Sequence, residues 1–182
     1  MNRPVCIDSL TPPEGGRIGL TAFPGRWRLF GSIGAEPHGV LCDLESIRGW
    51  GAGLLISLVE DEEFRFLGVD DMGALAARAG LDWLHLPIPD FRAPGPDFEA
   101  GWRHHGPEVH RRLANNEAVV IHCLAGLGRT GTLAARVLIE RGQAPQGAIA
   151  SVRLARPGAI QSQEQEDYLL RLGSLTRVGA RA

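Results

Sequence analysis

The sequence predicts an α/β fold with a layered sheet, and three observations lead to this prediction. Short apolar segments of the strand type alternate with helix-like segments along the chain, which is the pattern of a layered α/β sheet. The segment AGLLISLVE at 52–60 is continuously apolar, as strands buried inside a parallel sheet are. At 182 residues, the chain is long enough for one domain with a core and too short for two. We therefore expect one domain over residues 1–182, with 1–15 and 174–182 peripheral or frayed.

In the first half of the chain, turn residues and apolar spacing mark the expected elements. A strand at 18–22 ends at a Pro-Gly turn. A helix is expected from Asp43, a good N-cap residue ahead of apolar residues at spacings of three, and the strand at 52–60 follows it. The acidic segment 60–63 is interpreted as a solvated loop or helical turn. The helix at 70–80 then ends at its glycine.

The second half of the chain continues the alternation of strands and helices. Its first strand ends at a proline, and Asp97 is the expected N-cap of the helix that follows. The expected elements, in order, are the strand at 81–87, the helix at 97–113, the strand at 118–123, a helix that opens at Arg129, and the helices at 144–156 and 162–173.

Charge and composition exclude several classes of function. The formal charge is −2, so the protein as a whole does not attract nucleic acid or an anionic membrane, and we expect neither as a partner. All 19 basic residues are arginine, which we attribute to codon bias in a GC-rich, bacterial genome. Without lysine, neither a Walker A phosphate loop nor a Schiff base can form. We expect no cofactor.

The cysteines indicate a reducing environment. Cys6, Cys42 and Cys123 are an odd number without CxxC spacing, which argues against a disulfide framework and a zinc site. There is no apolar run of about 18 residues, and the first residues lack the continuous apolar segment of a secretory signal. We therefore expect a cytoplasmic protein. The sequence leaves open its oligomeric state and any redox role of Cys6 or Cys42.

The stretch EAVVIHCLAGLGRTG at 117–131 combines groups that can bind an oxyanion. Cys123 lies at the carboxyl end of a strand, where α/β folds place their ligands. Gly126 and Gly128 allow backbone N–H groups to turn inward around an anion, and the following helix directs its positive end at the same point. Arg129 carries a planar guanidinium that can bind two phosphate oxygens at once. These features predict a site for a dianionic oxyanion with a sulfur at its floor.

The same surroundings favour a reactive thiolate. A thiolate beneath a phosphate ester can attack phosphorus and form a phosphocysteine, which water then hydrolyses. Thr130 can donate its hydroxyl to the sulfur as it leaves, and His122 is expected to orient the loop rather than to titrate. The alternative is that Cys123 is only a small buried hydrophobe. However, the combined string HCxxGxxR[ST]G should arise by chance in on the order of one in 100,000 chains.

Three segments resemble a known family. HCLAGLGRTG resembles the signature of the cysteine-dependent protein tyrosine phosphatase superfamily. LPIPDFRAP at 86–94 and RPGAIQSQEQ at 156–165 make the chain similar to the dual-specificity branch, near the kinase-associated phosphatases that act on cyclin-dependent kinases. The resemblance extends from about Gly16 to Leu172. It implies a single-domain three-layer sandwich, with helices on both faces of a central, mainly parallel mixed sheet.

The resemblance also implies the roles of the loop residues. Cys123 would be the nucleophile and Arg129 the phosphate clamp. The substrate phosphate would bind to a cradle of backbone N–H groups from Leu124, Ala125, Gly126, Leu127, Gly128 and Arg129.

Asp90 is the candidate general acid. A phosphate monoester leaves well only when its bridging oxygen is protonated, and a general acid typically contributes ~10²–10⁴-fold. Asp90 follows a strand in a segment stiffened by prolines, and the resemblance places the family's acid on this Asp-x3-Pro pattern. The alternatives are that Asp90 only caps a turn, or that Asp97 is the acid, although Asp97 suits a helix N-cap better. Phe91 and Arg92 flank Asp90 and are candidates for contacting the substrate.

Two glutamines and three histidines are weaker candidates. Gln161 matches a glutamine with which related phosphatases position the hydrolytic water, and Gln165, one helical turn further on, either assists it or faces solvent. The histidines lie on one expected helix, but no nearby ligand completes a tetrahedral set. A solvated helix face is therefore the preferred interpretation of His104, His105 and His110.

The predicted function is a metal-independent phosphomonoesterase that acts on phosphorylated tyrosine, and on phosphorylated serine and threonine, of a protein. Tyrosine-specific relatives surround the substrate ring with a tyrosine-containing loop, whereas the only tyrosine here, Tyr168, lies in the last expected helix. A phosphoinositide or an RNA 5′-phosphate is an alternative substrate. Leu124 and Leu127 argue against the lipid, because lipid phosphatases of this kind carry lysine there, and the net charge argues against RNA. A non-catalytic phosphoprotein-binding module is the other alternative.

Overall fold

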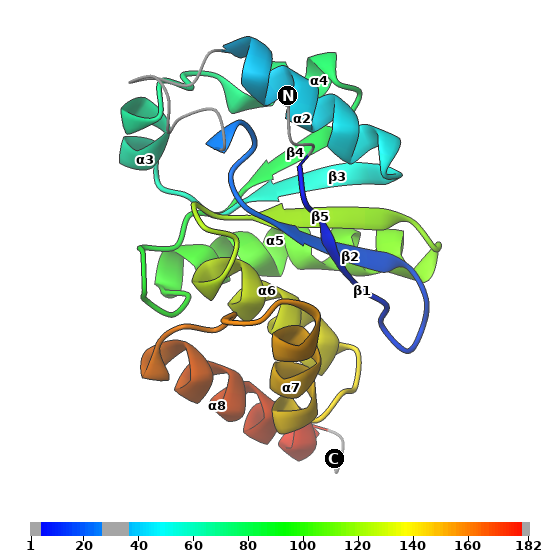
Figure 1. Ribbon diagram of the computed structural model, residues 1–182. Coiled ribbons are helices and arrows are strands. Elements are labelled where there is room, and N and C mark those ends of the chain that lie inside the picture. Colours follow the sequence, from blue (N-terminus) through cyan, green and yellow to red (C-terminus); the bar gives the residue numbers. More distant parts are fainter. Residues whose placement is uncertain (1–4, 27–36, 180–182) are drawn as a thin grey trace.

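A five-stranded mixed sheet forms the centre of the computed structural model, which describes residues 5–26 and 37–179 (Figure 1). The strand order is β1-β2-β5-β3-β4. Four strands run parallel, and only β1 pairs antiparallel with its neighbour β2. The strands are β1 (Asp8–Leu10), β2 (Arg17–Thr21), β3 (Ala52–Ser57), β4 (Asp82–His85) and β5 (Ala118–His122).

Helices cover both faces of this sheet, which confirms the predicted three-layer α/β sandwich (Figure 1). One face carries α2 (Pro37–Gly49), α3 (Asp61–Phe66) and α4 (Met72–Arg78). The other face carries α5 (Pro96–Ala114), α6 (Gly128–Glu140), α7 (Pro145–Ala155) and α8 (Gln163–Gly179). α6 packs against β2 and β5, and α7 and α8 both pack against α6.

The central strand β5 determines where the polypeptide leaves the core. All of its residues are buried, as expected for a strand covered on both faces of a parallel sheet. Its last residue, His122, pairs with Thr21 of β2 on one side and with Ser57 of β3 on the other. Cys123 therefore follows at the carboxyl edge of three adjacent parallel strands, which is where α/β sheets bind their ligands.

Two predicted helix caps are wrong. α2 begins at position 37 rather than at Asp43, and Asp43 lies inside the helix, where its buried carboxylate accepts a 2.7 Å hydrogen bond from the Gly25 N–H. α5 begins one residue before Asp97. Its N-cap is Gly95, and Pro96 at the first position supplies a fixed φ suited to starting a helix. In both cases an aspartate ahead of regularly spaced apolar residues gave the sequence pattern of a helix start, although the helix begins before it.

Two short elements complete the fold. The acidic segment after β3 forms the short helix α3, which bears out the helical-turn alternative rather than the solvated loop. The strand β1 was not predicted, because three residues are too few to show an alternating pattern. It is held as an edge strand by its pairing with β2.

None of the helices within residues 5–26 and 37–179 combines the length and the apolar character needed to cross a membrane.

Candidate active site

Residues 123–128, here called the cysteine loop, connect β5 to α6. Cys123 is only 2% exposed, and its Sγ accepts a hydrogen bond from the Gly126 N–H at 3.3 Å. α6 begins at Gly128 without a side-chain cap, so the positive end of the helix faces the loop. The sulfur therefore lies among groups that stabilise negative charge.

The shape of the cysteine loop depends on a glycine and on an arginine behind it. Gly126 has a φ of 71°, and a Cβ at this position would lie 2.2 Å from the backbone oxygen of Thr21, so only glycine fits. Arg156 donates to the backbone oxygens of Gly126 at 2.5 Å and Ala125 at 3.2 Å, and Asp8 pairs with the same guanidinium. Arg156, which sequence patterns did not identify, thus fixes the outer side of the loop.

Arg129, in the first turn of α6, is 1% exposed and has partners from two other segments. Its Nη1 and Nη2 donate to the two carboxylate oxygens of Glu63 at 2.5 and 2.8 Å. Nη1 also donates to the Ile88 backbone oxygen at 3.2 Å, and Nη2 lies 3.1 Å from Oδ1 of Asp90. Nε is buried and has no hydrogen-bond partner among the described residues. The terminal nitrogens of the guanidinium are thus fixed by two other segments, and Nε is left as an unsatisfied donor.

Glu63 is a site residue that sequence analysis missed, since it was assigned to a solvated acidic segment. Besides the ion pair with Arg129, its carboxylate accepts a hydrogen bond from the Glu60 N–H at 2.9 Å. Burial acts to raise the pKa of Glu63, but the hydrogen bonds from Arg129 and Glu60 outweigh it, and the pKa is lowered. The E-x-x-E spacing is a capping-box signal that predicts a helix start. This local signal does not predict that Glu63 pairs with Arg129, 66 residues further along the chain.

Residues 87–94, here called the acid loop, bring Asp90 to the same site. The Ile88 N–H donates to the backbone oxygen of Leu58 at 3.1 Å, which fixes the start of the loop to the segment after β3. The Asp90 side chain beside Arg129 is 51% exposed, so a substrate can reach it. Asp97 instead lies exposed in the first turn of α5. Of the two candidate acids, only Asp90 contacts the arginine of the cysteine loop.

Both predicted glutamines lie next to the cysteine loop. Gln161 Oε1 accepts a hydrogen bond from the Gly128 N–H at 3.0 Å. Gln165 is completely buried, so the solvent-facing interpretation was wrong. Its Oε1 accepts from the Gln161 N–H at 2.9 Å, and its Nε2 donates to the Arg92 backbone oxygen at 3.1 Å. The pair thus connects the cysteine loop with the acid loop.

The other predicted site residues differ in exposure. Phe91, next to Asp90, is 55% exposed and has a φ of 58°, in the left-handed region. Leu124 and Leu127 are partly exposed on the cysteine loop. Thr130 is buried, and its hydroxyl has no hydrogen-bond partner within the described parts of the chain. That hydroxyl does not bond to the sulfur in this structure, although it remains an unused donor in the first turn of α6.

His122 is completely buried and connects the cysteine loop to neighbouring strands. Trp83 Nε1 donates to Ser57 Oγ at 2.8 Å, and that oxygen lies 2.6 Å from His122 Nε2. Because the Ser57 hydroxyl then donates to Nε2, the ring proton belongs on Nδ1, which lies 3.3 Å from the Cys123 backbone oxygen. Burial lowers the pKa of His122 to about 4, against the opposing effect of this last contact. A neutral His122 can orient the loop, in line with the role expected from the sequence.

The buried His122 makes stability depend on pH. The folded protein resists protonating His122 until about pH 4, whereas the unfolded chain takes up this proton near pH 6.5. The contribution is therefore fully present above pH 6.5 and is lost as the pH falls. We expect the free energy of unfolding to decrease by about 2 kcal/mol between pH 7.5 and pH 5 through this group. Urea unfolding at both pH values measures the decrease, and an equal decrease in His122→Gln would contradict it.

The three histidines of α5 divide between two separate sets of contacts. The rings of His104 and His105 meet edge to face, with centroids 4.6 Å apart. His110 Nε2 instead lies 2.7 Å from Glu140 Oε2. In the part of the chain that the structure describes, no group of three or more histidine, cysteine, aspartate or glutamate side chains is arranged to hold a metal ion.

Known proteins resemble this chain in both sequence and structure. The sequence model of the family described as "Polymorphic toxin system, DSP-PTPase phosphatase" matches residues 42–143. Cyclin-dependent kinase inhibitor 3 of Mus musculus is 33% identical over 158 residues, which cover 84% of this chain and 69% of that protein. A kinase-associated phosphatase with serine in place of its catalytic cysteine has a TM-score of 0.81 at 25% identity, over 97% of this chain and 98% of the other. Tk-PTP in its active form has a TM-score of 0.67 at 27% identity, over 92% and 97%.

Proposed function

The chain belongs to the dual-specificity phosphatases of the cysteine-dependent protein tyrosine phosphatase superfamily, and from this premise we propose how its own residues carry out catalysis. It is a cysteine-based protein phosphatase. Cys123 is the proposed nucleophile, Arg129 the phosphate clamp and Asp90 the general acid. One observation carries these assignments: the Asp90 carboxylate lies 3.1 Å from Arg129, whose helix starts from the loop that holds the Cys123 sulfur.

In the first step, the phosphoryl group of the substrate lies in the cysteine loop. Backbone N–H groups of residues 124–129 and Nε of Arg129 donate to its oxygens, which stabilises the charge that spreads over them in the transition state. The sulfur of Cys123 attacks phosphorus, and the S–P bond forms as the P–O bond to the leaving group breaks. Asp90 donates its proton to the leaving oxygen. The product of this step is a phosphocysteine.

In the second step, water hydrolyses the phosphocysteine. Gln161 accepts the Gly128 N–H in the absence of ligand, and a phosphoryl group in the cradle takes over this donor. The released amide of Gln161 can then hold the attacking water, whose proton passes to the carboxylate of Asp90. As the P–S bond breaks, the unused hydroxyl of Thr130 donates to the departing thiolate.

The proposed substrates are phosphorylated tyrosine, serine and threonine side chains of proteins. The only tyrosine, Tyr168, lies in α8, where it donates to Glu99 of α5 at 2.7 Å. It therefore does not wall the substrate pocket, which supports a pocket shallow enough for short side chains. The exposed ring of Phe91, beside the acid, is the proposed contact with the substrate.

Replacement of the acid tests this function and its mechanism together. Wild type should hydrolyse phosphotyrosyl and phosphothreonyl peptides in the presence of a chelator. Asp90→Asn should lower kcat/KM for both peptides by about 10²–10⁴-fold, because asparagine cannot supply a proton to the leaving group. kcat/KM for esters with strongly acidic leaving groups should fall much less. Rates on the two kinds of substrate measure this difference, with Asp97→Asn as the matched control that should resemble wild type. An equal loss on both kinds would remove Asp90 as the acid.

The same rates decide between classes of substrate. The two partly exposed loop positions that would meet extra phosphates of a lipid headgroup are Leu124 and Leu127, which offer no positive charge. If wild type leaves the peptides intact but hydrolyses a phosphoinositide or an RNA 5′-phosphate, that class of compound would replace proteins as the proposed substrate. A folded wild type that binds phosphopeptides without turnover would be a binding module.

The proposed location is the cytoplasm. Cys6, Cys42 and Cys123 are not joined in disulfides, which fits a reducing compartment. A disulfide between Cys6 and Cys42 in the protein isolated without reductant would argue against this location.

A further inference from the structure

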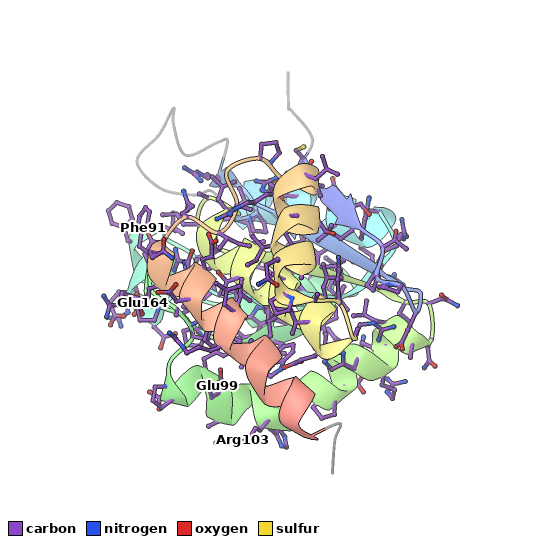
Figure 2. All side chains as sticks on the ribbon, turned by 90° about the horizontal axis from the view of Figure 1, so that it is seen from below. Phe91, Glu99, Arg103 and Glu164 are labelled. Carbon is purple, nitrogen blue, oxygen red and sulfur yellow. The ribbon has the colours of Figure 1, made fainter. Side chains whose placement is uncertain are left out.

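The far half of the acid loop is held by the beginning of α8. Glu164 Oε1 accepts a hydrogen bond from the Ala93 N–H at 3.2 Å, and Oε2 pairs with Arg92 Nη1 at 3.2 Å. The next residue, Gln165, donates to the backbone oxygen of Arg92 at 3.1 Å. Figure 2 shows Phe91 and Glu164 together at the N-terminal end of α8. Three contacts thus fix two consecutive residues that follow shortly after Asp90.

The backbone between these contacts is strained, so its conformation depends on them. Phe91 has a φ of 58°, a left-handed conformation that is unfavourable for a residue with a side chain. Its side chain is largely exposed and contributes little packing in return. Within the loop, the Arg92 N–H donates to the Pro89 backbone oxygen at 3.1 Å and closes a turn around Phe91. This turn is fixed on one side by the Ile88 N–H, which donates to the Leu58 oxygen after β3, and on the other side by Glu164. Strain of this kind persists only where surrounding contacts enforce it, and Asp90 lies directly beside the strained residue.

The same turn of α8 also contacts Gln161, the glutamine that is proposed to hold the attacking water in the second step. Gln165 accepts the Gln161 N–H, and Gln161 accepts the Gly128 N–H of the cysteine loop. The acid loop, the water-positioning glutamine and the phosphate cradle therefore share one short hydrogen-bonded segment. Glu164 contributes the contacts in this segment that reach furthest along the acid loop.

We propose that Glu164 is a positioning residue that latches the acid loop in the conformation where Asp90 can protonate the leaving group. This proposal rests on the proposed role of Asp90 as general acid. Glu164 does not touch the phosphoryl group and acts only through the loop. Its carboxylate uses one oxygen for the backbone and the other for Arg92, so the loop is held at two points.

Glu164→Ala tests the latch by its dependence on the leaving group. The variant should lower kcat/KM about tenfold for a phosphotyrosyl peptide, since a displacement of even 1 Å in a reacting group can cost more than this. It should leave kcat/KM for an ester with a strongly acidic leaving group, and inhibition by inorganic phosphate, within about twofold of wild type, because kcat/KM reports the step in which the leaving group departs and not the later hydrolysis of the phosphocysteine. Gln163→Ala, one residue earlier, is the matched control, because among the residues that the structure describes the Gln163 side chain bonds only to Asp167 of its own helix.

Two further variants keep the test decisive. Glu164→Gln can still accept the Ala93 N–H but loses the ion pair with Arg92, so it should show a smaller loss than Glu164→Ala. In an Asp90→Asn background, Glu164→Ala should cause no additional loss, because the group that it positions is gone. An undiminished loss in that background, or equal losses for both kinds of leaving group, would overturn the latch.

Failure of the latch and failure of the proposed function give different results. If Asp90→Asn alone shows no dependence on the leaving group, Asp90 is not the acid and the premise fails. If Asp90→Asn behaves as an acid variant while Glu164→Ala matches Gln163→Ala, the acid stands and the latch is wrong. Should Glu164→Ala not fold, Glu164→Gln and Arg92→Ala carry the same comparison.

Discussion

Cys123→Ser should abolish turnover, by on the order of 10⁴-fold or more, while phosphate affinity stays close to that of wild type. Serine has nearly the shape of cysteine, so the loop, with its glycine at a φ of 71° and its buried arginine, should remain intact. A neutral hydroxyl cannot replace a thiolate as nucleophile at neutral pH. Hydrolysis of para-nitrophenyl phosphate with chelator present measures turnover, and calorimetric titration with phosphate measures affinity.

The other cysteines provide the control for this prediction. Cys6→Ser and Cys42→Ser make the same chemical change at cysteines outside the cysteine loop, and their rates should match that of wild type. Acid quenching during turnover should trap phosphate on wild type and on both controls, but not on Cys123→Ser. Activity retained in Cys123→Ser would end the phosphocysteine mechanism.

The sequence predicted the cysteine loop because its geometry is local. A buried strand, a thiol, glycines and an arginine within a few residues at a strand–helix junction already determine where the sulfur and the N–H groups lie. The predicted sheet rests on similarly strong local patterns, and the parallel strands were found at their positions.

Residues that act through distant contacts were beyond the reach of such patterns. Glu63 and Arg156 support the loop from α3 and from the end of α7, and in the sequence each looks like one of many surface charges. Asp43 misled the prediction for the opposite reason, because its bond to Gly25 is tertiary while its sequence context imitates a cap. Only the folded sheet brings such segments together.

Arg129→Lys should reduce kcat/KM by about 10²–10³-fold, although it preserves the positive charge. The guanidinium binds both oxygens of Glu63 and the Ile88 carbonyl through its two terminal nitrogens, and it contacts Asp90 while Nε remains available. A lysine ammonium concentrates its donors on one nitrogen and cannot occupy these directions at once. Steady-state kinetics with para-nitrophenyl phosphate measure the loss, and near-normal values would contradict the clamp role.

Glu63→Gln tests how much the ion pair with Glu63 contributes to catalysis, compared with the planar geometry of the Arg129 guanidinium itself. The amide of glutamine can still accept one hydrogen bond from the guanidinium, but it no longer provides a second carboxylate oxygen or the ion pair. Because Arg129 keeps its contacts with Ile88 and Asp90 in this variant, the loss should be smaller than in Arg129→Lys. A larger loss in Glu63→Gln would mean that the support behind the guanidinium matters more than its grip on phosphate. The order of the two variants therefore decides whether Arg129 acts as a clamp or only as a charge held in place.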